Sequence, residues 1–448
     1  MASRKAKSAW TEADQQSYAM HSRFPKWTQC EHMHCDRCIW WRIRMMDVSL
    51  PREEREEAAR QLAEHKIFIA AHNRMTASLK RQAQLNPRVA PLFIEIDGKT
   101  GKHDFLPNLP QSTHILGEMM RLQVHTVNVV VHGHEPQYMA FTVFNDFAHG
   151  SALVAEVLHR VLKKLQETEK RLPPTCIVRA DNCWRENKNQ MILCRLFSIW
   201  RRKGIFQRTF GFFSMKGHTH CPPDMLASQM NMALSAGEPI RSLQDYHDRL
   251  RTCVAGTGKL VYVEHVDKIW NIAGTTPEQQ VVWTPRTIVN GTGGLTMYHS
   301  FKVEMDSKSG DVLLNYKRWP ISSCWHLAPI ICILGSTPEQ ALDAELKRMP
   351  LCRVKDIPHS AAIIRDLDSL PAKFKKLGME CPFSDSDLQA LRRVADGSEA
   401  RQRIEKLDKA VADGQIDFLA DLPVWRFDQQ GPPRDVFESD RKRLQETA

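Results

Sequence analysis

Between residues 89 and 240, short apolar runs and helical segments follow an order that few folds allow. The strand-like runs, rich in apolar and β-branched residues, are 92–97, 125–132, 138–144, 176–181 and 207–215. The segments with helical spacing are 151–169, 185–202 and 223–236. Gly133–Pro136 joins the second and third strands as a hairpin connection, whereas the later strands alternate with helices. This order predicts a three-layer α/β domain with a mixed sheet.

The flanking segments add one long helix, more strands and a tail. Pro51 followed by acidic residues predicts a helix over 52–84, with room for one break. Three further strand-like runs are Lys259–Val263, Phe301–Met305 and Val312–Tyr316, and a capped helix is expected over 336–348. We expect four parts. They are 1–88 with a Cys/His cluster and helix, 89–240 as core, 241–350 as its mixed α/β continuation, and 351–448 as an acidic helical tail.

Charge and cysteine content limit the class of protein. The net charge is +10, but residues 356–448 hold 15 Lys and Arg against 18 Asp and Glu, which leaves 47 against 34 for residues 1–355. The basic N-terminus has no apolar segment after it, and no apolar run approaches the ~20 residues that span a bilayer. We therefore expect an intracellular protein without a membrane partner. Its 12 Cys should be mostly buried thiols, with a few metal ligands.

Three aspartates stand where predicted elements end or begin. Asp97 ends the first strand of the core, Asp181 ends the fourth, and Asp224 lies at the start of the helix after the fifth. In a ribonuclease-H-like arrangement, strands one and four are adjacent, so carboxylates at their ends meet at one edge. Carboxylates so close repel one another unless a cation lies between them, and Mg²⁺ prefers anionic oxygen. The pattern predicts a site for two Mg²⁺ or Mn²⁺ ions that supports phosphoryl transfer.

Each aspartate also has a simpler structural role. Asp97 can serve an Asp-Gly turn, Asp181 can cap a helix, and Asp224 can fill the first turn of another helix. Only their joint placement favours the metal site, so both interpretations stay open.

A basic stretch begins directly after Asp181. Residues 185–216 hold eight Lys and Arg and a single acid, Glu186. Such a stretch attracts phosphate backbones through counterion release, although a solvated helix face gives the same pattern. The predicted nucleic-acid contacts are Arg185, Lys188, Arg195, Arg201, Arg202 and Lys203.

The string 181–189 (DNCWRENKN), with Gly217-His218-Thr219-His220 downstream, resembles a family of eukaryotic transposon-derived domains. Asp97-Gly98 and His132-Gly133 upstream agree with it. The resemblance extends over roughly Cys30 to Tyr316 and implies a ribonuclease-H-like, DDE transposase-type core. It implies Asp97 and Asp181 as the first two acidic positions. Residues of the matching strings, namely Glu186, Asn187, Asn189, His218 and His220, are then expected to support the site.

The third acidic position departs from that family. The family usually reads GHTHEDID, whereas residues 217–224 read GHTHCPPD, so Asp224 alone remains and Cys221 stands where an acid is usual. If the chemistry uses the last acid, the site is complete. If it uses a lost one, the chain is an inactive DNA- or protein-binding descendant.

His218 and His220 allow another interpretation. An H-x-H pair after a strand also holds Zn²⁺ in unrelated hydrolases, with His132 or Asp181 as further ligands. The histidines otherwise orient the carboxylates or donate to a phosphate.

An N-terminal cluster predicts a structural zinc site. Cys35-x-x-Cys38 has the spacing of a zinc knuckle, with Cys30 nearby and His65 and His72 on the following helix. The resemblance favours His65, which gives Cys30, Cys35, Cys38 and His65 as the ligand set. The alternative is that the thiols are simply buried.

Taken together, these features predict a transposase-like or nuclease-like protein. We expect Mg²⁺ or Mn²⁺ and structural Zn²⁺ as cofactors, DNA as a partner, homo-oligomerisation as a further option, and a nuclear location.

Overall fold

The structure is a computed structural model. It describes residues 35–99, 104–109, 119–169, 171–181, 183, 186–189, 191–214, 221–272, 298–306, 309–317, 326–329 and 339–423. The chain divides into two compact units, and of these residues the first unit holds 35–77 and 214, and the second holds 78–213 and 221–423. In the described part of the chain, no helix has both the length and the apolar character needed to cross a membrane.

Two helices make up the described part of the first unit. They are α3 (Asp36–Met46) and the first part of α4 (Arg52–Leu85), which continues without a break into the second unit. Buried Cys35, Cys38 and Leu62 pack together with Trp41 against them. A contact this small buries little apolar area, so a bound structural metal ion would add substantially to the stability of the first unit.

The second unit is built on a mixed sheet. Its strands are β1 (Leu92–Lys99), β2 (Phe105–Leu106), β3 (Leu122–His132), β4 (Tyr138–Phe144), β5 (Thr175–Ala180), β6 (Arg208–Phe213), β7 (Val261–His265), β8 (Ser300–Met305), β9 (Val312–Lys317) and β10 (His326–Pro329). The order is β10-β9-β8-β6-β5-β1-β3-β4-β7, with β2 paired to β3. β1 pairs parallel with β5, and β5 with β6, whereas β3 pairs antiparallel with both β1 and β4. The predicted mixed sheet and flanking helices are confirmed.

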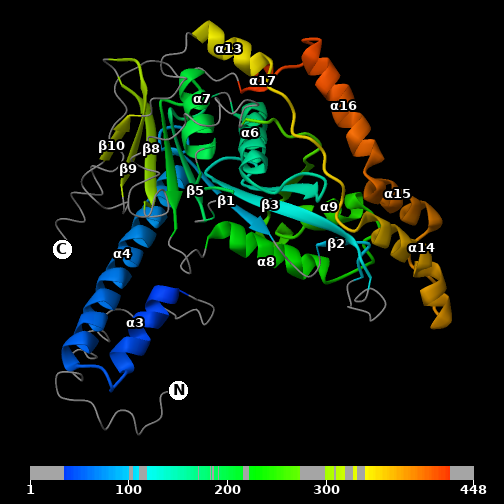
Figure 1. The fold of residues 1–448 in the computed structure, drawn as a ribbon, viewed down its shortest axis with the longest axis horizontal. Helices are drawn as coiled ribbons and strands as arrows, with labels where there is room; N and C mark the ends of the chain where they lie inside the picture. The colour runs from blue at the N-terminus through cyan, green and yellow to red at the C-terminus, as the bar shows by residue number, and fades with distance from the viewer. Residues whose placement is uncertain are drawn as a thin grey trace. The chain divides into compact units, whose positions relative to one another are not determined.

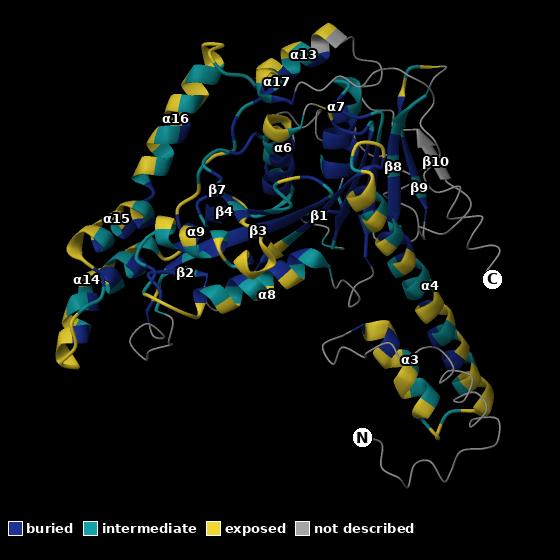
Figure 2. Cartoon of the chain, turned by 180° about the vertical axis from the view of Figure 1, so that it is seen from behind, coloured by how far each residue is buried: buried dark blue, intermediate teal, exposed yellow. Residues whose placement is uncertain are grey.

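Helices cover both faces of this sheet (Figure 1). One core contains α6 (Ser151–Thr168), η1 (Met191–Leu196) and α7 (Phe197–Arg202), packed on the side chains of Ile94 and Ile96. The other contains α8 (Pro222–Leu234), α9 (Leu243–Arg251), α14 (Ser360–Lys376) and α15 (Asp385–Asp396). Figure 2 shows the sheet strands buried between these layers. Alternation along β1 therefore turns Glu95 and Asp97 away from α6, toward the face that carries α8.

One predicted helix differs in the structure. Residues 185–202 were expected to form one helix, but 186–189 form a turn and the helical part begins at Met191 as the π-helix η1. The side chain of Asn189 accepts from the backbone N–H of Ile192 over 3.1 Å, which caps this later start.

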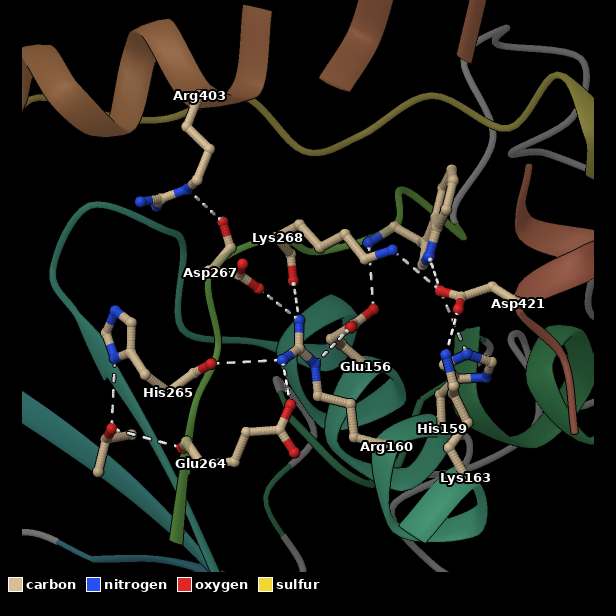
Figure 3. Close-up of polar contacts among 12 residues, drawn as sticks. Glu156, His159, Arg160, Lys163, Glu264, His265, Asp267, Lys268, Arg403 and Asp421 are labelled. Carbon is tan, nitrogen blue, oxygen red and sulfur yellow. Dashed lines mark hydrogen bonds and ion pairs between the residues drawn. The ribbon is translucent and has the colours of Figure 1, made fainter. Parts of the chain in front are cut away.

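The C-terminal helices belong to the second unit and pack against its two cores. They are α13 (Glu339–Lys347), α14, α15, α16 (Ser398–Ala412) and α17 (Phe418–Asp421). Earlier in the chain, a short 3₁₀ helix, η2 (Ala255–Thr257), precedes β7. Figure 3 shows the polar network beneath them: Asp421 of α17 pairs with Lys163 of α6 and accepts from Trp270 Nε1 over 3.0 Å. The ion pair between Asp421 and Lys163 ties the tail to α6. Nearby, Arg160 of α6 pairs with Glu264 and Asp267.

Candidate functional site

The strand pairing brings two of the predicted aspartates to one edge of the sheet. Ile96 of β1 and Ala180 of β5 are direct partners in a parallel pair. Asp97 and Asp181 each come next along the chain, and paired strands lie about 4.8 Å apart. The two residues are therefore neighbours.

The third aspartate joins them from the N-terminus of α8. The carboxylate of Asp224 accepts from the backbone N–H of Cys221 over 2.9 Å, which forms a capping box. The Cys221 Sγ lies 3.2 Å from Oδ2 of Asp224 and 4.0 Å from Oδ2 of Asp97. Asp97, Cys221 and Asp224 each offer one ligand atom, and these three atoms lie within 4.8 Å of one another.

The carboxylates perturb one another. Burial, the charge of Asp181 and the charge of Asp224 raise the pKa of Asp97 to about 8. Burial and the charge of Asp181 also raise the pKa of Glu186 above its ordinary value. Among the described residues, no Lys or Arg forms an ion pair with Asp97, Asp181 or Asp224. The cluster concentrates negative charge that a cation would neutralise.

Each aspartate also makes local hydrogen bonds. The backbone N–H of Gly98 donates to Oδ1 of Asp97 over 2.8 Å. Oδ1 of Asp181 accepts from the backbone N–H of Cys183 over 3.0 Å and from Nδ2 of Asn187 over 2.6 Å. Of the simpler roles, capping by Asp224 is present. Asp97 was predicted to end its strand and serve a turn, but β1 continues through Gly98 to Lys99. Asp181 accepts within a turn and caps none of the described helices. These hydrogen bonds leave further carboxylate lone pairs for a ligand, because an ionised carboxylate offers about four acceptor positions.

A small cavity opens beside Asp97 and contains a histidine that the sequence did not indicate. Its polar lining comes from Asp97, His125, Glu186 and Asn187, and the N-terminal end of α6 closes one side. His125 is 9% exposed and stacks on His149 with ring centroids 4.1 Å apart. Burial, His149 and Lys99 lower the pKa of His125 to about 4, so its imidazole is neutral at physiological pH.

A second missed feature supports β1 from the interior. Glu95, two residues before Asp97, is fully buried and pairs with Arg179, His132 and Lys80. His132 Nε2 lies 2.7 Å from Oε2 of Glu95, and Lys80 Nζ lies 3.0 Å from the same oxygen. The partners hold the pKa of Glu95 down at about 2, despite burial that opposes this. The sequence offered one signal for this role: Glu95 and Asp97 are two residues apart in a strand, so their side chains lie on the same face of the sheet.

The donor chemistry fits a divalent cation. Asp97, Asp181 and Asp224 offer carboxylate oxygens, and Glu186 lies close to Asp181. The residues whose ligand atoms lie close enough together to share a cation here are Asp97, Cys221 and Asp224, and Asp181 is not part of this group. Oxygen ligands alone suit Mg²⁺ or Mn²⁺, but the Cys221 thiol is a softer donor than Mg²⁺ prefers.

The first unit holds a separate group that could bind a metal. Cys35, Cys38 and His65 are all buried, and their ligand atoms lie within 4.8 Å of one another. Cys35 Sγ lies 3.4 Å from Nε2 of His65. The neighbouring Cys35 thiol, followed by burial, raises the pKa of Cys38 above its ordinary value. Among the predicted ligands, Cys30 lies outside the described residues.

The basic stretch is less exposed than predicted. Lys188 is 2% and Arg195 is 3% exposed, so the prediction of a basic helix face is wrong for these two. Burial lowers the pKa of Lys188 to about 7, and Arg195 pairs with Glu345. Lys203 pairs with Asp343. Arg201 and Arg202 remain half-exposed on α7.

Three of the remaining predicted site residues, Arg185, His218 and His220, lie outside the described residues. Comparison with protein families matched residues 116–322 to a domain of unknown function (DUF7869). This match covers somewhat less than half of the chain and includes Asp181 and Asp224 but not Asp97. Comparisons with curated proteins and with solved structures gave no match.

Proposed function

We propose that this chain is a transposase-like or nuclease-like protein that acts on DNA by two-metal phosphoryl transfer. The observation that carries the proposal is the position of Asp97, which lies beside Asp181 where the pairing of β1 with β5 ends and beside Asp224 at the start of α8. Acids whose pKa values are perturbed by one another beside a cavity are typical of functional sites.

The order of the strands supports the ribonuclease-H-like part of this proposal. In that arrangement the first and fourth core strands are adjacent, and here β1 and β5 are parallel neighbours. Asp97 and Asp181 then correspond to the acids at these strand ends, and Asp224 to the acid on the helix after the fifth core strand. A transposon-derived origin and a nuclear location are proposals on the same basis.

In the proposed site, each side chain has a defined task. Asp97, Asp181 and Asp224 hold Mg²⁺ or Mn²⁺, and such ions stabilise the attacking and leaving oxygens of an in-line displacement. Asn187 and the Gly98 N–H orient the carboxylates, since each donates to one oxygen and leaves the other available.

Incubation of the purified chain with labelled DNA tests the proposal. We expect cleavage or strand transfer that requires Mg²⁺ or Mn²⁺ and is lost in Asp181→Asn. Asp413→Asn is the matched control, because Asp413 is exposed at the end of α16 in the same unit. Absence of cleavage with every divalent ion, or cleavage unchanged by Asp181→Asn, would reject the catalytic proposal.

A second candidate is an inactive descendant that binds DNA or protein. One observation favours it: Cys221 stands where the resembling family has an acid. DNA binding without metal-dependent cleavage would establish this alternative. A zinc hydrolase that uses His218 and His220 would instead cleave small substrates and show no affinity for DNA.

We also propose structural Zn²⁺ in the first unit, held by Cys35, Cys38 and His65 with Cys30 as the fourth ligand. The buried convergence of two thiols and an imidazole supports it, because closed N/S sets of this kind are typical of structural zinc. About one Zn²⁺ per chain, lost in Cys35→Ser, is the expected result. Metal-free protein with unchanged melting would reject it.

A further inference from the structure

The cavity beside Asp97 lies on the face of the sheet that carries α6. Gly98, His125, Glu186 and Asn187 line it, and apolar side chains of α6 close the other side. A Cβ atom added at Gly98 would lie 3.8 Å from Oε2 of Glu186 and 3.6 Å from Cε1 of His125. The Glu186 carboxylate therefore lies against β1, one residue after Asp97.

The side chain of Asn187 has a buried acceptor that none of the described residues satisfies. Asn187 is 3% exposed, its Nδ2 donates to Oδ1 of Asp181, and its Oδ1 has no hydrogen-bond partner. Because Asp181 engages the amide nitrogen, the amide cannot be turned to exchange its two atoms, and the free atom stays an acceptor. A buried carbonyl oxygen without a partner keeps its full desolvation cost. A cation or a hydrogen-bond donor in the cavity would remove that cost.

The Glu186 carboxylate has no partner either. In the part of the chain that the structure describes, no group forms a hydrogen bond or an ion pair with it. The facing His125 imidazole is neutral at physiological pH, since burial, His149 and Lys99 lower its pKa to about 4. The N-terminus of α6 also borders the cavity, but such an end carries only ~0.5 of an elementary charge, less than the carboxylates of Glu186 and Asp181 together. The polar lining is thus rich in acceptors and negative in charge.

We propose that the Glu186 carboxylate and Oδ1 of Asn187 bind a divalent cation, Mg²⁺ or Mn²⁺, on the α6 face of the sheet edge. The inference rests on the proposed function and assigns one of its two metal positions. Asp97 lines this cavity and also belongs to the group with Asp224, so it lies between the two positions. Carboxylate and amide oxygens are the ligands that Mg²⁺ and Mn²⁺ prefer. Binding releases any proton on Glu186 to solvent, so affinity increases with pH.

Titration of the full chain with Mn²⁺, followed by electron paramagnetic resonance, tests the assignment. We expect Glu186→Gln to bind one Mn²⁺ at least ~10-fold more weakly than the wild type does, while the ion that depends on Asp224 is kept. Asp224→Asn should give the reverse pattern. Glu380→Gln is the control, because Glu380 is exposed in the same unit and lies outside the cavity. Equal Mn²⁺ binding by the wild type and by Glu186→Gln would overturn the inference.

The same titration separates this inference from the proposed function. If Mn²⁺ binding requires Asp97, Asp181 and Asp224 but not Glu186, the proposed metal site stands and the inference fails. If binding requires Glu186 and none of the three aspartates, the cation position stands and the two-metal proposal fails. If binding requires none of the four acids, both fail.

Discussion

The side-chain amide of Asn187 donates to Oδ1 of Asp181 over 2.6 Å, so the turn after β5 orients the carboxylate that directly follows the strand. Hydrogen bonds to charged groups contribute about 1.5–3 kcal/mol, and outer partners of metal ligands typically alter affinity ~10–100-fold. We predict that Asn187→Ala weakens Mn²⁺ binding by about 10-fold, measured by isothermal titration calorimetry. Asn145→Ala is the control, because Asn145 donates to Gln123 over 2.7 Å away from the carboxylates. Equal effects of the two variants would contradict the positioning role.

The raised pKa of Asp97 makes the stability of the metal-free protein depend on pH. With a folded pKa of about 8 and an unfolded value near ~3.9, the folded state retains the proton longer. The contribution of Asp97 to stability is therefore complete at low pH and is lost as pH rises toward 8. We predict that Asp97→Asn becomes more stable than the wild type by on the order of 1–2 kcal/mol near pH 8 but not near about pH 4, measured by denaturant unfolding. Saturating Mn²⁺ should remove this difference, and a difference independent of pH would count against the account.

Much of the fold followed from local pattern. The runs at 92–97, 138–144 and 176–181 became β1, β4 and β5 with nearly the same bounds, because β-branched and apolar runs bounded by turns carry their own signal. The helix predicted over 185–202 begins later, at Met191, because the side chain of Asn189 accepts from the backbone N–H of Ile192 and caps that start. The pairing of β7 with β4 and of β8 with β6 could not be derived, since pairing across more than 80 residues leaves no local trace.

The buried network behind the site should dominate the stability of the sheet. Glu95 is fully buried and depends on Arg179 and Lys80 for its charge. Removal of one partner of a buried pair typically costs 3–5 kcal/mol, so we predict a loss of about 3 kcal/mol for Arg179→Gln by denaturant unfolding. Glu95→Gln combined with Arg179→Gln should cost less than the sum of the single changes. Full additivity would show that the charges do not interact.

The same reasoning identifies the pH range in which this network acts. Because the folded pKa of Glu95 is lowered to about 2, its stabilisation is present above the unfolded value of about 4.3 and is lost as pH falls through 2.

The tail should detach when its network is cut. Asp421 of α17 pairs with Lys163 and His159 of α6 and accepts from Trp270 Nε1 (Figure 3). Asp421→Ala leaves these groups without their shared acid, and we predict a loss of about 2 kcal/mol together with faster proteolysis after α15. Asp413→Ala is a control, since Asp413 is exposed at the end of α16. Unchanged proteolysis in Asp421→Ala would refute the role of this network in holding the tail.

The site itself was predictable only in part. The aspartates stand next to strand ends and a helix start, so topology alone brought them together. His125 and Cys221 gave no comparable signal: one is a single histidine within a strand, and the other became part of the cluster only through the packing of α8 beside β1. The exposure of Lys188 and Arg195 was overestimated, because charge along a sequence does not reveal which side chains find buried partners.

Electron paramagnetic resonance of Mn²⁺ bound to the purified chain tests the central claim most directly. Two ions about 4 Å apart in a shared carboxylate site couple magnetically. At saturating Mn²⁺, the account predicts a spin-coupled pair that disappears in Asp97→Asn and in Asp181→Asn and persists in Asp413→Asn. Uncoupled Mn²⁺ spectra that are the same in the wild type and in Asp97→Asn would contradict it.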